Sequence, residues 1–299
     1  MWLFAAVGSA ILLGFYDVFK KQASATNDVL HILLWATALS TLLLSPFLIA
    51  SAFGTGWFDG TVFSVTQGTL QEHLLVLLKS AIVSVSWITG LMGLKNLPLT
   101  TAGTIKTFRP LFILAGSILI FREHPNGWQW AAMLLALTAL WLLGRTSRKE
   151  GVDFTRNKWV FCMWTAVLTG VISALMDKHL MASMHPMFVQ SWCNFYIALI
   201  MAIIVLVGRF THRAFYKPYR HDWYVWLIAL FITASDFLYF LSLHSSGSML
   251  SVVSMLRRSS VIITFLCGAV FFKEKNLHGK GLALVILLIA IALLVYGSV

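Results

Sequence analysis

Charged residues are scarce in this chain of 299 residues: only 11% are Asp, Glu, Lys or Arg, and only 11 residues are acidic. In a typical soluble domain about a quarter of the residues are charged. Hydrophobic residues make up 59% of the chain, with 22 Phe and 12 Trp. The sequence therefore predicts an integral membrane protein and excludes an ordinary soluble domain.

Patterns that would indicate catalysis or metal binding are also missing. The three cysteines, Cys162, Cys193 and Cys267, lie within apolar runs and show neither paired nor metal-ligand spacing. The nine histidines form no metal-ligand pattern, so we expect neither a metal nor a cofactor. No Ser/His/Asp set, HExxH sequence or phosphate-binding loop occurs, which argues against an enzyme. No small-residue cleavage site follows the first apolar run, so we expect that run to direct the chain to the membrane.

Apolar runs long enough to cross a bilayer occur ten times. A helical span needs about 20 residues, because the hydrocarbon core is about 30 Å thick and a helix rises about 1.5 Å per residue. The sequence thus predicts an all-α membrane protein with ten transmembrane helices, embedded in the lipid bilayer. The runs cover residues 2–19, 29–53, 73–94, 99–121, 127–144, 158–178, 187–208, 223–244, 249–272 and 280–298.

Basic residues in the loops are distributed unequally over the two sides of the membrane. If the spans alternate in direction, one side receives nearly all of them, including those of segments 145–158 and 209–220. The other side receives Arg122, Lys178 and, as a borderline case, Lys79. Because loops rich in Lys and Arg stay in the cytoplasm, we expect both termini outside, in a protein of the bacterial inner membrane. The net charge of +11 reflects these loops and does not indicate nucleic-acid binding.

The two halves of the chain resemble each other. Phe-Arg-Glu at 121–123 closes the fourth run, Phe-Lys-Glu at 272–274 closes the ninth, and at this register Lys106 aligns with Arg257. Five spans per repeat is an odd number, so the second repeat is inserted upside down. We therefore predict two inverted five-helix repeats around a central cavity, an architecture typical of alternating-access transporters. The repeats cover residues 1–147 and 158–299, and a basic cytoplasmic linker covers residues 148–157.

Four basic residues lie inside these runs: Lys106 and Arg109 in the fourth, Arg257 and Arg258 in the ninth. Each charge near the middle of a span costs about 2.5–3.5 kcal/mol, so four unpaired charges would cost about 10–14 kcal/mol. They must therefore face a polar cavity. Lys106 lies about 10 Å deep from the cytoplasmic side and Arg257 about 12 Å deep from the outer side, so their levels differ by about 8 Å. Flexible side chains on either side of a phosphate-sized anion close such a gap.

Charges at this depth also fit arrangements in which no substrate takes part. Long basic side chains reach toward the interface, and a cation can pair with a carboxylate within the membrane. Asp17, Asp177 and Asp236 are the candidate partners. For Arg258 such a pair and direct contact with substrate have equal weight, because Arg257 and Arg258 are about 100° apart on a helix and cannot point the same way.

Four further residues are candidates for the lining of the cavity. Asp236 lies in the interior of its run, whereas Asp17 fits equally well as a carrier of a coupling proton and as a local partner of the lysines that follow it. Tyr239 and Trp87 are the aromatic candidates. Aromatic residues in spans usually serve packing or the interfacial belt.

These features resemble the drug/metabolite transporter superfamily of the EamA type. The resemblance covers nearly the whole chain and includes Lys-Asn-Leu-Pro at 95–98 and Ser-Ser-Gly at 245–247, together with the two tripeptides that close the fourth and ninth runs. Within the superfamily, Lys106 with the pair at 257–258 resembles the basic residues that bind phosphate in triose-phosphate and related sugar-phosphate translocators. This chain differs from those in having Arg-Arg where they have Lys-Arg, and Arg109 where an acidic residue often precedes the proline.

We therefore expect a secondary transporter, not an enzyme, that moves a small anionic metabolite, phosphorylated or carboxylated, by alternating access, as a monomer or homodimer. The alternative within transport is an exporter of amino acids or drug-like amines, in which the carboxylates neutralise the basic residues. The alternative of another class is a non-transporting scaffold or receptor, which would not need four charges at the midplane. The predicted substrate-binding residues are Lys106, Arg109, Arg257, Arg258, Asp236, Asp17, Tyr239 and Trp87.

Overall fold

The structure is a computed structural model that describes residues 2–54, 56–58, 60–96, 105–106, 108–145, 157–211, 222–260, 262–263, 267 and 277–297. These residues form ten helices and no strand, as the sequence predicts for an all-α protein. The helices are α1 (Trp2–Thr26), α2 (Val29–Ala52), α3 (Leu70–Asn96), α5 (Phe108–Phe121), α6 (Gly127–Arg145), α7 (Lys158–Met181), α8 (Pro186–Thr211), α9 (Trp223–His244), α10 (Leu250–Arg258) and α12 (Leu277–Tyr296).

Six of these helices are long and apolar enough to cross a membrane: α1, α2, α3, α7, α8 and α9. Large apolar side chains point outward from the bundle: Phe4, Leu119 and Phe161 are 84%, 80% and 74% exposed. In water such a surface would drive association, whereas in a bilayer it contacts lipid chains at no cost. The chain is therefore an integral membrane protein.

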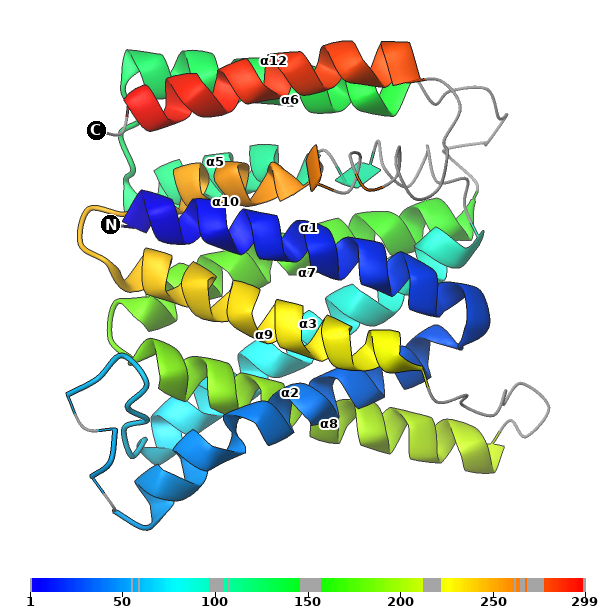
Figure 1. Ribbon diagram of the computed structural model, residues 1–299, viewed down its shortest axis with the longest axis vertical. Helices are drawn as coiled ribbons and strands as arrows, with labels where there is room; N and C mark the ends of the chain where they lie inside the picture. The colour runs from blue at the N-terminus through cyan, green and yellow to red at the C-terminus, as the bar shows by residue number, and fades with distance from the viewer. Residues whose placement is uncertain are drawn as a thin grey trace.

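The helices lie side by side along one direction, with both chain termini at the same end of the bundle (Figure 1). We call this end the terminal end: α1 begins there at Trp2 and α12 ends there at Tyr296. We call the other end the linker end: α6 ends there at Arg145 and α7 begins there at Lys158.

The helices of the two halves pack in a corresponding way. The most extensive contacts are those of α1 with α9, α3 with α7, α2 with α8 and α6 with α12. Smaller contacts join α2 with α9, α3 with α8, α1 with α10 and α5 with α7. Exchanging α1, α2, α3, α5 and α6 for α7, α8, α9, α10 and α12 converts each of these contacts into another of them or into itself. These larger contacts are therefore equivalent in the two halves.

Hydrogen bonds between helices follow the same exchange. The Ser86 hydroxyl of α3 donates to the Ala166 carbonyl of α7 at 2.8 Å, and the Ser235 hydroxyl of α9 donates to the Ser9 carbonyl of α1 at 2.8 Å. Glycine also permits a close approach of α1 to the chain after α10, since a Cβ on Gly14 would lie 2.9 Å from the Ser260 carbonyl oxygen. Small residues and polar side chains at helix crossings are the usual means of association in lipid.

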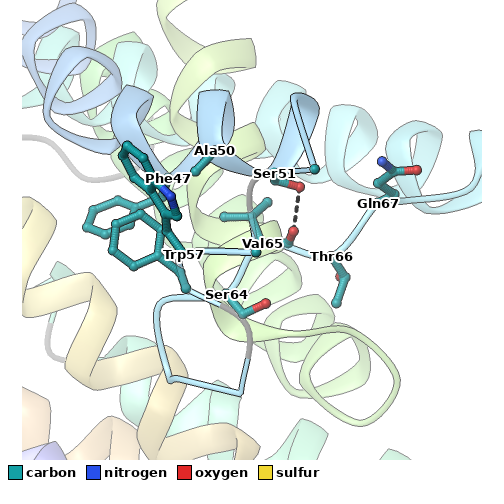
Figure 2. Close-up of a pocket in the computed structure, with 11 residues that line it drawn as sticks. Phe47, Ala50, Ser51, Trp57, Ser64, Val65, Thr66 and Gln67 are labelled. Carbon is teal, nitrogen blue, oxygen red and sulfur yellow. Dashed lines mark hydrogen bonds between the residues drawn. The ribbon is translucent and has the colours of Figure 1, made fainter.

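A loop of residues 53–69 joins α2 to α3 at the terminal end. Its described residues and the end of α2 line a half-open cavity of about 290 Å³ beside Phe47 and Trp57 (Figure 2). The Ser51 hydroxyl donates to the Val65 carbonyl at 2.5 Å and fixes the loop against the helix. None of the predicted site residues lines this cavity.

Candidate functional site

A second cavity, of about 310 Å³, lies between the helices in the middle of the bundle. This volume falls at the lower end of the range typical of small-molecule sites. Side chains of α1, α3, α5, α7, α8, α9 and α10 line it. All eight residues that the sequence predicts for the site are among them: Asp17, Trp87, Lys106, Arg109, Asp236, Tyr239, Arg257 and Arg258.

The sequence prediction of the site omitted three charged residues that also line the cavity: Lys20, Lys79 and Asp177. Asp177 was considered only as a partner of a basic residue, and Lys79 was counted as a borderline case among the basic residues of the outer side. That placement of Lys79 is wrong, because α3 begins at Leu70 and carries Lys79 about 13 Å along its axis. A lysine within an apolar run was the signal that pointed to the interior.

The first ion pair of the cavity joins Lys79 of α3 to Asp177 of α7. Lys79 Nζ lies 3.1 Å from Asp177 Oδ1, and the two residues are only 4% and 6% exposed. The Tyr239 hydroxyl donates to Asp177 Oδ2 at 3.2 Å, and Lys79 Nζ donates to Cys193 Sγ at 3.2 Å. Four helices, α3, α7, α8 and α9, thus meet at one buried and electrically neutral cluster. We call Lys79, Asp177, Cys193 and Tyr239 the floor cluster.

The second ion pair joins Arg257 of α10 to Asp236 of α9. Arg257 Nη2 donates to Asp236 Oδ1, and its guanidinium lies 4.3 Å from the centre of the Tyr239 ring. A guanidinium over an aromatic face gains cation–π attraction in addition to the ion pair. Both arginines of α10 line the cavity, and it is Arg257 rather than Arg258 that has the carboxylate partner.

Three cations of the cavity have no carboxylate within 4 Å among the described residues: Lys106, Arg109 and Arg258. Arg109 Nη2 donates to the Gly170 carbonyl at 2.9 Å. A glycine is needed there, because a Cβ on Gly170 would lie 2.9 Å from Arg109 Cζ. The backbone of α7 therefore positions this guanidinium without neutralising it.

The charges that line the cavity do not balance. The described lining residues include six basic side chains, from Lys20, Lys79, Lys106, Arg109, Arg257 and Arg258, and three acidic ones, from Asp17, Asp177 and Asp236. Two of the three carboxylates are held in ion pairs. The lining side chains therefore give the cavity a positive potential, which a low-dielectric surrounding strengthens.

The charged side chains of the cavity differ in their exposure. Asp17 and Lys106 are exposed, and Arg109 and Arg258 are half-buried. The floor cluster is buried, with Tyr239 only 5% exposed. Lys106 precedes α5, which begins near the middle of the bundle and runs toward the terminal end. The cavity therefore opens toward the linker end and is closed toward the terminal end.

Within the described part of the chain, no group of three His, Cys, Asp or Glu residues is arranged to hold a metal ion.

Comparison with known proteins supports the architecture. The model of the EamA-like transporter family matches residues 1–145 and 157–296. One solved structure, described only as "Crystal structure of protein", superposes with a TM-score of 0.71 over 97% of this chain and 97% of its own, at 13% sequence identity. At that identity the likeness concerns the fold alone. A search of curated proteins finds no match.

Proposed function

Because the chain belongs to the EamA-like transporter family, we propose that it is a secondary transporter that moves a small anionic metabolite, phosphorylated or carboxylated, by alternating access. The family membership identifies a membrane transporter. The observation that supports an anionic substrate is the excess of basic over acidic side chains in the cavity.

Lys106, Arg109 and Arg258 are the residues that we propose as direct ligands of the substrate. They lack carboxylate partners among the described residues, whereas Lys79 and Arg257 are neutralised by Asp177 and Asp236. Unpaired charges within a membrane are costly, so an anion that occupies the cavity relieves a cost that the empty site bears. The guanidinium of arginine can donate two hydrogen bonds to a planar carboxylate or a tetrahedral phosphate group, and the ammonium of lysine adds a point charge.

The proposal of alternating access rests on the equivalence of the two halves. The larger helix contacts of one half correspond to those of the other, and the more exposed cavity residues lie away from the buried floor cluster. We propose that the two halves are inverted repeats and that exchanging their conformations opens the cavity toward the terminal end. With the basic loops in the cytoplasm of a bacterial cell, the linker end faces inward and both termini face outward.

The sign of the charge on the substrate is tested by ligand-induced stabilisation of the purified protein. The ligands of the panel share one carbon skeleton and differ only in the group they carry: a phosphate ester, a carboxylate, a neutral alcohol or an amine. A ligand raises the unfolding temperature only if it binds the native state, so the temperature reports which of these groups the protein binds. We expect stabilisation by the phosphate ester or the carboxylate. Stabilisation by the amine alone would overturn the proposal and favour the amine exporter.

A variant of Asp236 sharpens this test. Asp236→Asn removes the carboxylate that neutralises Arg257, so we expect anion binding to be retained or tightened. A protein that binds amines would lose an attractive charge and bind them more weakly. Glu72→Gln is the matched control, because Glu72 lies at the start of α3, accepts a hydrogen bond from the Thr69 amide and does not line the cavity.

A further inference from the structure

Glu123 makes a buried contact between α5 and α10 that lies outside the cavity. It is 8% exposed and accepts hydrogen bonds from the Leu250 amide at 2.5 Å, the Ser251 amide at 3.2 Å and the Ser251 hydroxyl at 2.5 Å. The first amides of a helix have no partner within the helix, and the helix dipole favours negative charge there. A carboxylate from the end of α5 thus binds the N-terminus of α10.

The backbone at the end of α5 is shaped to present this carboxylate. Arg122 has a φ of 52°, a left-handed conformation that residues with a side chain rarely adopt. The turn directs Glu123 back, so that its amide donates to the Ser117 carbonyl at 3.4 Å while its side chain reaches α10. Many helices end with one left-handed residue, and here that ending orients the Glu123 side chain toward α10.

A second contact holds the same segment from another helix. Lys178 of α7 donates to the Ser248 carbonyl at 2.5 Å and to the Ser248 hydroxyl at 2.8 Å, two residues before α10 begins. The end of α5 and the start of α10 both lie at the terminal end, where the cavity is closed (Figure 1). The ends of α5, α7 and α10 are therefore joined on the side of the molecule opposite the opening.

We propose that Glu123 is a latch that keeps the terminal end closed and that breaks and re-forms once in each transport cycle. The proposal rests on the alternating access proposed above. The two helices that Glu123 joins also carry the cations of the cavity, Arg109 on α5 and Arg257 and Arg258 on α10. Of these, Arg109 and Arg258 have no carboxylate within 4 Å among the described residues, so they repel each other, and an anion between them draws α5 and α10 together at that level. The charge of the substrate thus acts on the same pair of helices that the latch holds.

The latch is tested by distance measurement with two spin labels, using double electron–electron resonance on the protein in lipid nanodiscs. Labels are placed at Gly127→Cys, at the start of α6, and Ser246→Cys, before α10, in a background in which Cys162 and Cys267 are serine and the buried Cys193 of the floor cluster is retained. Both positions are exposed, and nothing lies within 4 Å of a Cβ on Gly127. The latched state gives a short distance, and the unlatched state a longer one.

Glu123→Ala removes a charge-assisted contact, so we expect the ratio of long to short distance to rise about tenfold or more. Glu123→Gln keeps a single accepting oxygen and Ser251→Ala removes one donor, so both give smaller rises and test the latch even if the alanine variant does not fold. Glu72→Gln is the control at the same end of the molecule, and we expect it to leave the distribution unchanged.

Distributions that are identical in wild type, Glu123→Gln and Ser251→Ala would overturn the latch. If inorganic phosphate still shifts the distance distribution of the wild type in that case, the proposal of alternating access stands without the latch. The variants can also show the longer distance while the protein transports no anion. That result would uphold the latch and overturn only the proposed substrate class.

Discussion

We expect the buried ion pair of Lys79 and Asp177 to have a large effect on the free energy of unfolding. Removing one partner of a buried ion pair leaves the other charge uncompensated and costs about 3–5 kcal/mol. We expect this loss for Lys79→Met, which leaves the Asp177 carboxylate with the Tyr239 hydroxyl but no cation at 3.1 Å, and for Asp177→Asn, which leaves the Lys79 ammonium with the Cys193 thiol, the Phe240 ring and an uncharged amide. If independent, the two losses would add to about 6–10 kcal/mol in the double variant.

The double variant has no buried charge at this place, so we expect it to lie within about 2 kcal/mol of the wild type. Its free energy of unfolding is measured by titrating purified protein from lipid–detergent micelles into a denaturing detergent. Lys106→Met is the matched control, because Lys106 is an exposed cavity cation without an ion pair among the described residues, and we expect little or no loss. Additive losses in the double variant, or a loss in Lys79→Met no larger than in Lys106→Met, would refute this reasoning.

Two further predictions concern the site and the topology. Gly170→Ala should weaken anion binding about tenfold, because a Cβ there displaces the Arg109 guanidinium from its carbonyl partner. The control Gly208→Ala, with nothing within 4 Å of its Cβ, should leave binding unchanged when both variants are titrated with the same anion. Single cysteines at Thr61 and Arg148 should differ when intact cells are labelled with an impermeant maleimide: only the Thr61 site should react, and labelling at Arg148 would invert the orientation.

The sequence was sufficient to predict the helical architecture, because long apolar runs are strong signals. Seven of the ten helices lie within about three residues of the predicted runs at both ends, and α3 begins at Leu70 rather than at residue 73. The fourth and ninth runs lie only partly within the described residues. The four cations also identified the cavity, since charge within an apolar run must face a polar space. These inferences need only composition and spacing.

The pairing of charges could not be predicted in the same way. Whether Asp236 meets Arg257 or Arg258 depends on the rotation of α10 against α9, and a rotation of about 100° exchanges the two arginines. Lys79 was misplaced because its depth depends on where α3 begins. The Phe-Arg-Glu tripeptide was noticed as a repeat signal, but its contact with α10 requires knowing that the ends of α5 and α10 meet.

Counterflow in proteoliposomes tests the central claim most directly, because it reports movement across the membrane rather than binding. Vesicles are loaded with one unlabelled compound from a panel of sugar phosphates, nucleotide sugars, carboxylates, amino acids and amines, and uptake of the labelled form is followed. We expect uptake only with an anionic compound, and we expect Arg258→Gln to reduce it at least tenfold by removing an unpaired cation of the cavity. Uptake of a neutral or cationic compound, unaffected by Arg258→Gln, would contradict the account.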